Sequence, residues 1–260
     1  LLRVNLSDVA AKGAVPFGYM LACHWSERCG WPEREAFVAG LRRDQAIFDI
    51  HLLGGDTVKT TGPASFSVTM MGWVPSGTAI HRGGARAGDD VFVTGTIGDG
   101  WLGLLACQGK LSLDPDRLQT LQNAYRTPTP RTDYADLVLK YATASCDVSD
   151  GLLADAGRIA EASGLCVEID LAVTPLSGAG QSWFDSRVDD EAALEQLASG
   201  GDDYQILFTA PAGQEDAVRR ESERRHVRVT KIGRVTEGRG LSVVYQGQVI
   251  NPVRVGWTHD

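Results

Sequence analysis

From about residue 90 onward the sequence alternates between short strand-like runs and longer helix-like stretches, and this order limits the possible folds. The strand-like runs cover residues 91–94, 144–148, 166–170, 204–209, 229–235 and 241–250. The helix-like stretches cover residues 101–108, 116–125, 133–142, 150–163, 190–198 and 213–226. Such an alternation is typical of α/β or α+β proteins, in which helices and sheets pack in layers. We therefore predict a layered α/β (α+β) fold.

The first part of the chain has a less regular pattern. Residues 7–24 are predicted to form a helix with small residues on its packing side, and residues 35–50 form a pattern typical of an amphipathic helix. The stretch LLGGDTVKTTGP (52–63) is rich in turn-forming residues. It precedes an alternating run, at about 66–74, which we predict to be a strand.

A boundary is indicated by the segment GTAIHRGGARAGDD (77–90). It contains four glycines and no long apolar period, and a strand-like run follows it directly. A chain of 260 residues is long enough for two domains of ordinary size. We therefore predict two domains, residues 1–78 and 79–260.

The composition excludes several classes of protein. The formal net charge is −8, from 25 basic and 33 acidic residues, which disfavours nucleic-acid binding through a general basic field. No apolar run approaches about 18 residues, so we expect no membrane span. Five scattered cysteines, without a CxxC pair, indicate reduced thiols and a cytoplasmic protein. Because the chain starts at Leu1, without a Met, we expect that an N-terminal portion precedes it.

Three acidic segments are candidates for metal binding: NLSD (5–8), GGDT (54–57) and CDVSDG (146–151). In the third, Asp147 and Asp150 flank Ser149 where a strand-like run meets a helix-like one. Each carboxylate could instead cap a helix or a turn, and Ser7 or Asp8 fits a helix start. Hard divalent cations such as Mg²⁺ prefer several carboxylate oxygens, so the three segments together favour a metal site.

Other residues suit the binding of phosphate groups. The paired glycines of GGDT would let a phosphate approach backbone amides, although an ordinary Gly-Gly turn explains them equally well. Arg82 could bind a phosphate with its guanidinium fork or lie in solvent. The chain has no GxxxxGK[ST] loop, so metal ions would have to anchor a nucleotide. Asp202 and Asp203 precede a strand-like run, where they could meet a ligand or cap a turn.

Six motifs, in this order, resemble the thiamine-monophosphate kinase family. They are NLSDVAAKGA, LLGGDTVKTTGP, HRGGARAGDDVFVTGTIG, CDVSDGLLAD, SGGDDYQILF and GWTHD. This family belongs to the superfamily of aminoimidazole ribonucleotide synthetase. The resemblance covers essentially the whole chain and implies the two-domain fold of that superfamily, with its N-terminal part truncated here. It also implies a homodimer that transfers the γ-phosphoryl group of ATP to thiamine monophosphate, giving thiamine diphosphate.

The resemblance also implies roles for particular residues. The expected ligands of several Mg²⁺ ions are Asp8, Asp56, Asp147 and Asp150. The expected ATP contacts are Gly55, Asp56, Arg82 and Ser149. Asp202 corresponds to a substrate-binding acid and Trp257 to an aromatic residue that covers the thiamine. No protein base is expected, because the accepting phosphate is already ionised and the transfer needs alignment and charge neutralisation.

The chain departs from the family pattern in two places. It lacks an upstream Gly-Asp-Asp turn and a Thr-Asp-rich segment ending in His, and it has GGDDYQI where the family usually has Gly-Glu-Asp-Tyr-Glu-Leu. The second departure shortens the substrate-facing acid by one methylene. Two alternatives stay open at this stage. One is another ATP-using member of the superfamily, such as aminoimidazole ribonucleotide or selenophosphate synthetase. The other is an inactive remnant that binds nucleotide or only dimerises.

Overall fold

A strand with alternating buried and exposed side chains organises the N-terminal region of the computed structural model, which describes residues 1–257. Every second residue of this strand, from Tyr19 to Trp25, is buried, and these residues form one core with the partly buried Phe37, Leu41 and Phe48 of the following helix. The flanking strands pair with it in the order β2-β1-β3, β2 parallel and β3 antiparallel to β1. The elements are β1 (Val15–Ser26), α2 (Trp31–Phe48), β2 (His51–Thr60) and β3 (Ser65–Trp73).

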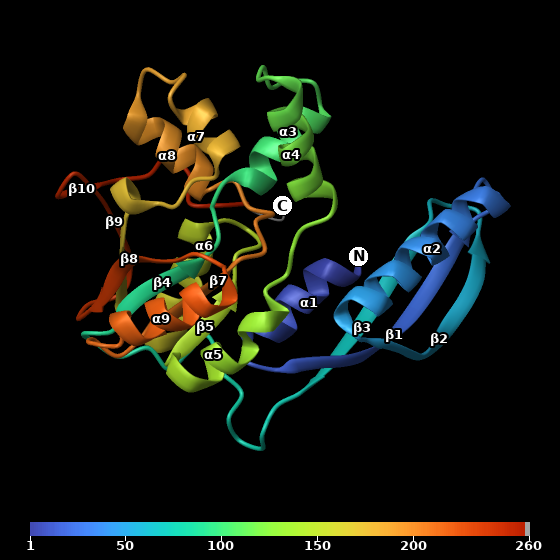
Figure 1. The fold of residues 1–260 in the computed structure, drawn as a ribbon, viewed down its shortest axis with the longest axis horizontal. Helices are drawn as coiled ribbons and strands as arrows, with labels where there is room; N and C mark the ends of the chain where they lie inside the picture. Colours follow the sequence, from blue (N-terminus) through green and yellow to red (C-terminus); the bar gives the residue numbers. More distant parts are fainter. Residues whose placement is uncertain (258–260) are drawn as a thin grey trace.

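Helix α1 (Leu2–Ala11) connects the two parts of the molecule (Figure 1). Leu2 and Leu6 belong to the core of the N-terminal sheet, whereas Ala10 and Ala11 belong to a core of the larger C-terminal part. The spacing of Leu2, Leu6 and Ala10 by four residues places them along one face of the helix. The two parts of the chain therefore share one helix in their hydrophobic cores.

Two predictions for this region are wrong. The predicted helix at 7–24 ends at Ala11, and the chain continues as strand β1. Gly13 has φ +70°, and a side chain there would collide with Leu139, so a glycine terminates the helix where it turns into the strand. The predicted turn at 52–63 is largely strand β2. One of its glycines, Gly55, is required because β2 passes very close to β1 there.

The C-terminal part contains a seven-stranded sheet within the described residues, with strand order β10-β9-β6-β8-β4-β7-β5. Apart from the parallel pair β6–β9, neighbouring strands in it are antiparallel. The central strands β4 and β7 are buried along their whole length, and the rings of Phe92 and Phe208 stack with centroids 5.3 Å apart. The strands are β4 (Asp90–Thr94), β5 (Ala144–Asp147), β6 (Cys166–Asp170), β7 (Ile206–Ala210), β8 (Val229–Thr236), β9 (Gly240–Tyr245) and β10 (Gln248–Ile250).

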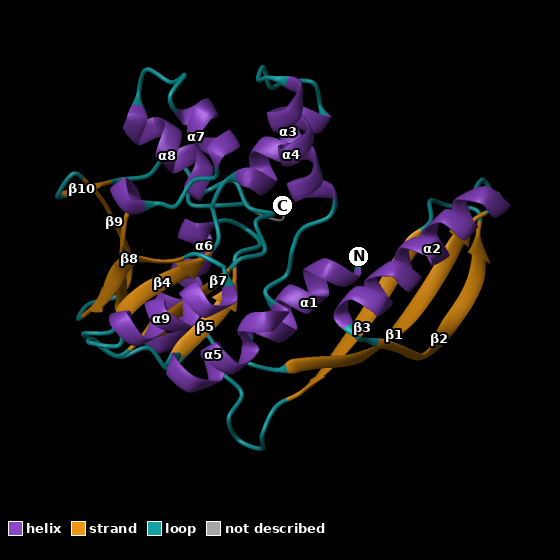
Figure 2. Cartoon of the chain, viewed as in Figure 1, coloured by secondary structure: helices purple, strands orange, loops and turns teal. Residues whose placement is uncertain are grey.

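Some helices pack against this sheet and others group together beside it around a core of their own, as Figure 2 shows. They are α3 (Asp99–Cys107), α4 (Pro115–Arg126), α5 (Ala135–Tyr141), α6 (Leu152–Ser163), α7 (Gly178–Phe184), α8 (Asp190–Ala198) and α9 (Glu215–Arg225). Short 3-10 turns lie at Thr132–Tyr134 and Leu171–Val173. The alternating order predicted from the sequence is confirmed, except that α7 was missed and the last predicted strand is two strands, β9 and β10. No helix of residues 1–257 is long and apolar enough to cross a membrane.

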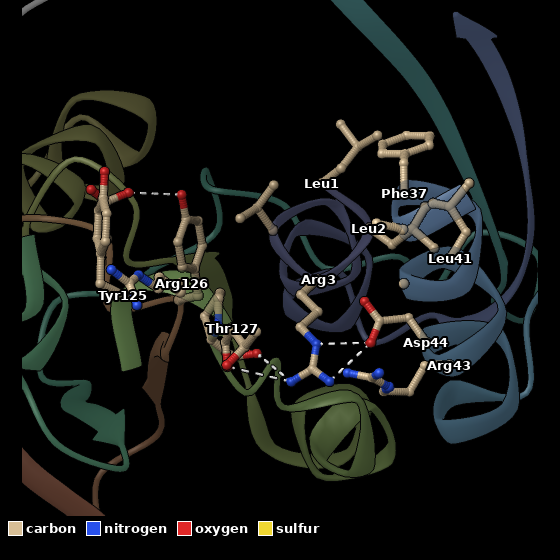
Figure 3. A pocket seen from close by; sticks show the side chains of 16 residues that line it. Leu1, Leu2, Arg3, Phe37, Leu41, Arg43, Asp44, Tyr125, Arg126 and Thr127 are labelled. Atoms are coloured by element: carbon tan, nitrogen blue, oxygen red, sulfur yellow. Dashed lines mark hydrogen bonds and ion pairs between the residues drawn. The ribbon is translucent and has the colours of Figure 1, made fainter. Parts of the chain in front are cut away.

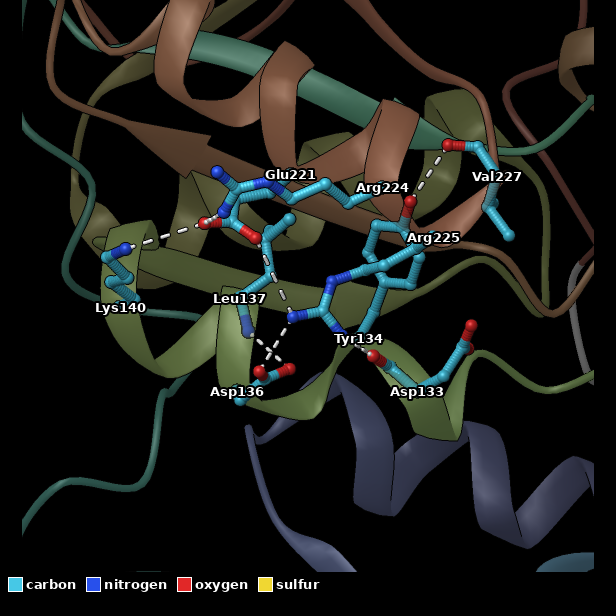
Figure 4. A network of polar contacts seen from close by, with 9 residues as sticks. All are labelled: Asp133, Tyr134, Asp136, Leu137, Lys140, Glu221, Arg224, Arg225 and Val227. Atoms are coloured by element: carbon cyan, nitrogen blue, oxygen red, sulfur yellow. Dashed lines mark hydrogen bonds and ion pairs between the residues drawn. The ribbon is translucent and has the colours of Figure 1, made fainter.

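A group of charged residues joins α9 to α5 on the surface (Figure 4). Arg225 donates to Asp136 Oδ2 at 2.7 Å, and Lys140 lies 3.6 Å from Glu221. Beneath them the Tyr134 hydroxyl donates to the carbonyl of Val227 at 2.8 Å. Exposed ion pairs of this kind stabilise a fold by less than about 1 kcal/mol each, so the buried tyrosine is the firmer connection.

Candidate functional site

Two carboxylates from different elements approach each other where α1 meets the end of β5. Asp147 ends β5 and is only 4% exposed, whereas Asp8 lies on α1 and is exposed. Burial, and then the nearby charges of Asp8 and Asp155, together raise the pKa of Asp147 to about 7, while the Ser7 hydroxyl acts in the opposite direction. A buried acid beside a second acid needs a neutralising partner, either a proton or a cation.

The predicted capping role of Asp8 is wrong. Asp8 lies inside α1, one turn before its end, so it cannot serve the free amides at a helix start. Ser7 is fully buried and donates to the carbonyl of Tyr204 at 3.2 Å. Ser7 of NLSD therefore helps to pack α1 onto the C-terminal part, and Asp8 points to the surface beside Asp147.

The turn CDVSDG is held from below by an acid on α6. Asp155 is 1% exposed and accepts hydrogen bonds from the backbone amides of Ser149 at 3.0 Å and Asp150 at 3.1 Å. Arg158, one turn further along α6, forms ion pairs with both Asp150 and Asp155. Asp155 thus accepts the backbone hydrogen bonds of this turn, a role for which Asp150 was an alternative candidate.

A second turn, which precedes β7, packs against this first one. The amide of Asp202 donates to the carbonyl of Ser149 at 2.8 Å, and that of Tyr204 donates to Val148 at 2.8 Å. Both residues have positive φ angles, 62° for Asp202 and 51° for Tyr204. Such angles are costly for residues with side chains, and they persist where surrounding contacts impose them, often at functional sites.

The two neighbouring acids of this turn have different tasks. Asp203 is buried and accepts from the amides of Gly98 at 2.8 Å and Gly100 at 3.0 Å, at the start of α3. Burial raises the pKa of Asp203 to about 8. Asp202 instead accepts a hydrogen bond from the Tyr204 hydroxyl at 2.9 Å. Capping therefore belongs to Asp203. Ligand contact by Asp202 stays a prediction.

A cavity of about 410 Å³ brings four of the predicted site residues together. It is lined by Trp101, Leu104, Tyr125, Ser149, Asp150, Gly200, Asp202, Tyr204, Arg254 and Trp257. Trp257 is 55% exposed, and its amide donates to the carbonyl of Asp150 at 2.9 Å, which fixes the C-terminal segment at the rim. The walls are aromatic and the floor is acidic. This combination suits a planar ligand that carries positive charge.

A further cavity of about 510 Å³ lies on the other side of the Asp202–Tyr204 turn (Figure 3). It separates α1 and α2 from the end of α4, and Asp202 and Tyr204 line it as well. Across it, Arg3 forms an ion pair with Asp44 at 2.9 Å and donates to the carbonyl of Pro128 at 3.2 Å. The turn that carries Asp202 therefore stands between two adjoining hollows.

Gly55 and Asp56 lie elsewhere, on β2. A Cβ at Gly55 would come within 1.8 Å of the Leu21 carbonyl oxygen, so the close approach of β1 requires a glycine there. At Gly54, by contrast, a Cβ would meet nothing within 4 Å. Asp56 is exposed and accepts from the amide of Thr57 at 2.8 Å. Strand packing thus explains why position 55 is a glycine. No protein atom covers Gly54 on the side where a Cβ would lie.

Two basic residues lie near the Asp8–Asp147 pair. Arg82 is exposed, on the segment that connects the two sheets, and Lys12 follows α1 directly. Lys12 Nζ donates to the carbonyl of Ser145 at 3.4 Å. Burial, and then the charge of Arg82, lower the pKa of Lys12, while Asp147 and Asp8 act in the opposite direction. The surroundings of the acidic pair are therefore of mixed charge.

The donor atoms at the acidic pair fit Mg²⁺. Among residues 1–257, no group of three or more His, Cys, Asp or Glu side chains is arranged to hold a metal ion. Mg²⁺, however, is usually bound by one or two carboxylates and completes its shell with water and substrate phosphates. The close pair Asp8 and Asp147, one exposed and one buried, meets that requirement.

Several residues of the site were missed in the sequence. Asp155 and Tyr204 stand within motifs quoted above, CDVSDGLLAD and SGGDDYQILF, so their positions beside the candidate acids were a usable signal. Lys12 likewise stands in NLSDVAAKGA, four residues after Asp8. Trp101 and Tyr125 carried no such signal, because α3 and α4 reach the cavity through the fold alone.

Two families match successive parts of the chain. The family described as "AIR synthase related protein, N-terminal domain" matches residues 1–74. The family described as "AIR synthase related protein, C-terminal domain" matches residues 86–246. The second match alone covers more than half of the chain.

Individual proteins are similar over nearly the whole chain. A thiamine-monophosphate kinase of Caulobacter vibrioides is 47% identical over 259 residues, which is 100% of this chain and 73% of the relative. The crystal structure of thiamine-monophosphate kinase from Stenotrophomonas maltophilia has a TM-score of 0.85 and 38% identity, and the match covers 96% of this chain and 78% of that one. A structure described as AaThiL complexed with AMPPCP and TMP has a TM-score of 0.82 and 34% identity, covering 98% and 78%.

Proposed function

The chain belongs to the thiamine-monophosphate kinase family of AIR synthase-related proteins, and we propose that its two acidic turns form the catalytic site of that reaction. The activity is the ATP-dependent phosphorylation of thiamine monophosphate to thiamine diphosphate. The alternative of a synthetase from the same superfamily is set aside, because the curated relatives above are kinases. The observation that carries the proposal is the meeting of Ser149, Asp150, Asp202 and Trp257 around one cavity.

In this proposal the phosphates lie at the α1–β5 junction. Asp8 and Asp147 would hold Mg²⁺ there, with Asp150 and Asp56 as further ligands. Mg²⁺, when bound, would supply the positive charge that offsets two anionic substrates in an acidic protein. Gly55, Asp56, Arg82 and Ser149 are the proposed ATP contacts. The accepting phosphate is ionised at neutral pH, so the protein needs to align the two phosphates rather than remove a proton.

The thiamine end of the substrate would occupy the aromatic cavity. Its thiazolium ring carries a positive charge, which favours stacking on Trp257 and Trp101 and attraction to the carboxylate of Asp202. Burial, followed by the charge of Asp202, raises the pKa of Tyr204, so its hydroxyl stays protonated and keeps donating to Asp202. That hydrogen bond would fix the orientation of the shortened acid.

We also propose a homodimer formed through the N-terminal sheet. Side chains along β1 alternate between the two faces of the sheet, so Met20, Ala22 and His24 point away from α2. Asp56 and Val58 lie on the same face, because they pair with Ala22 and His24. Met20 is 49% and Val58 39% exposed. A two-fold interface would cover this apolar face with its own copy. It would also place Asp56 within the interface instead of on an open surface.

Two coarser features complete the proposal. We place the division between an ATP/Mg-binding N-terminal domain and a C-terminal α/β domain at residues 78 and 79, within the exposed connecting segment. We assign the protein to the cytoplasm, since all five cysteines are unpaired thiols.

The substitution Asp202→Asn tests the proposal. If Asp202 meets the thiamine ring, its loss should raise the KM for thiamine monophosphate about tenfold, since interactions of charged groups contribute about 1.5–3 kcal/mol. Binding of an ATP analogue, measured by calorimetry, should stay nearly unchanged. An equal loss for both ligands, or for neither, would contradict the assignment. Wild-type protein that shows no Mg²⁺-dependent binding of the analogue would support the remaining alternative, an inactive remnant.

A further inference from the structure

A lysine lies beside the acidic pair in a position that the reaction as proposed does not use. Lys12 follows Asp8 by four residues, so the two side chains emerge on the same face at the end of α1. An acidic residue that precedes a basic one at this spacing forms the favourable orientation of such a pair. Lys12 is half-buried, although lysine side chains are mostly exposed in folded proteins.

Backbone hydrogen bonds tie the connecting segment to Lys12 and to β5. Its carbonyl accepts from the amide of Ile80 at 3.1 Å, and the amide of Ser145 donates to the carbonyl of His81 at 3.0 Å. The connecting segment thus runs between Lys12 and β5, and places Arg82 next to both. Lys12 Nζ itself reaches the carbonyl of Ser145 at 3.4 Å, two residues before Asp147.

The ammonium group has donors left for a ligand. A lysine has three N–H donors, and the described residues use one of them, in the long bond to Ser145. The charged groups around it are Arg82, Asp147 and Asp8. Arg82 is a second cation beside Lys12, so the charge of the two acids does not need Lys12 alone to balance it. Two cations and two carboxylates in one place match a site that receives metal and phosphate together.

We propose that Lys12 is a phosphate-binding residue of this enzyme, donating directly to a phosphate oxygen of ATP beside Asp8 and Asp147, the residues that would hold Mg²⁺. The inference rests on the proposed function and adds to it a residue that the family resemblance did not supply. Arg82 would bind the same phosphate chain from the connecting segment. Lys12 would thus repel the metal ion and attract the nucleotide.

These opposite effects provide the test. In Lys12→Met, Mg²⁺ alone should bind more tightly, because a positive charge beside its ligands is gone. A non-hydrolysable ATP analogue with saturating Mg²⁺ should bind about tenfold or more weakly, because a charged hydrogen bond is lost. Isothermal titration calorimetry measures both constants, and thermal unfolding shows whether the variant is folded. Lys12→Arg, which keeps the charge and donors, should retain most of the analogue affinity.

A matched control is Lys110→Met, which removes the same charge from an exposed position after α3 and should change neither constant. A purely structural or counter-charge role predicts that the analogue binds Lys12→Met as well as the wild type, or more tightly because Mg²⁺ does. Either result would overturn the inference and leave the proposed function intact. Wild-type protein that fails to bind the analogue would overturn both.

Discussion

The two sheets present aspartates of the same predicted role in opposite surroundings. Asp56 lies on the outer face of the three-stranded sheet and is exposed, with one hydrogen bond to its own neighbour. Asp147 ends a buried strand of the seven-stranded sheet and is 4% exposed, close to Asp8 and Asp155. The C-terminal site is thus already organised by its own fold, whereas the N-terminal face depends on what covers it.

This difference follows from how each sheet is covered. Helix α2 covers one face of the N-terminal sheet (Figure 1). The other face carries the exposed side chains of Met20 and Val58. The strands β4, β5 and β7 of the larger sheet are buried along their length. An ionised carboxylate on the exposed face costs little free energy of folding. One in the buried sheet destabilises the fold unless a proton or a cation neutralises it.

The largest expected effect separates these two aspartates. Asp147→Asn and Asp56→Asn should both lower turnover about a hundredfold or more, since each removes a proposed metal ligand. Their stabilities should differ. Asp147→Asn should melt at the same or a higher temperature, because it removes a buried charge next to Asp8, whereas Asp56→Asn should stay within about 0.5 kcal/mol of the wild type. Steady-state kinetics and calorimetric unfolding without ligand measure the two quantities.

If Asp147→Asn melted at a lower temperature and Asp56→Asn at a higher one than the wild type, the comparison would be wrong. Asp147 would then stabilise the fold, and Asp56 would destabilise it. Asp150→Asn is a useful third variant. The ion pair of Asp150 with Arg158 means that its replacement should cost some stability, unlike that of Asp147.

A second prediction concerns the open face itself. Leu53 is 47% exposed and lies next to Gly18, on the side of the sheet away from α2. Leu53→Lys should convert the proposed dimer to a monomer, because two lysines would face each other across a two-fold axis. The monomer should keep its melting transition in the larger domain but lose turnover, since Asp56 would be uncovered. Sedimentation velocity gives the mass. Wild type that sediments as a monomer would contradict the proposed interface.

The smallest expected effect is a pH dependence confined to the C-terminal part. The pKa of Asp203 is raised to about 8 by burial, above its ordinary value of 3.8. A raised carboxyl pKa contributes stability that is fully present below about pH 4 and is lost as the pH rises through about 8. The melting temperature of the wild type should therefore fall by a few degrees between pH 5 and 9.

Asp203→Asn should begin from a lower melting temperature, because its amide group cannot accept both backbone N–H groups at α3, but it should fall less over the same pH range. Asp56→Asn serves as the control and should keep the slope of the wild type. A slope that is unchanged in Asp203→Asn would show that other buried acids, such as Asp99, carry the dependence.

The sequence by itself determined the order of elements after residue 90 and the motifs that hold the site. The alternating apolar pattern of a strand and the small or charged residues at a helix end are properties of a short stretch of sequence, so they can be recognised without the folded structure. The Asp-bearing turns around 147–150 and 202–203 could be found for the same reason. Their order along the chain, with the other motifs, was enough to indicate the family.

The helix at 35–50 and the strand at 66–74 were predicted correctly as α2 and β3. The strand at 15–26 and the different roles of the acids could be known only from the tertiary structure. Residues 15–26 form a strand because β2 and β3 pair with them and α2 covers every second side chain, which no local preference of this stretch predicted. Asp203 caps α3 and Asp202 faces a cavity because the fold brings Gly98 and Gly100 to one of two adjacent, chemically identical side chains. Long-range contacts of this kind have no trace in a short window of sequence, so the burial and pKa of each acid, and the position of Lys12 beside them, could be known only from the folded chain.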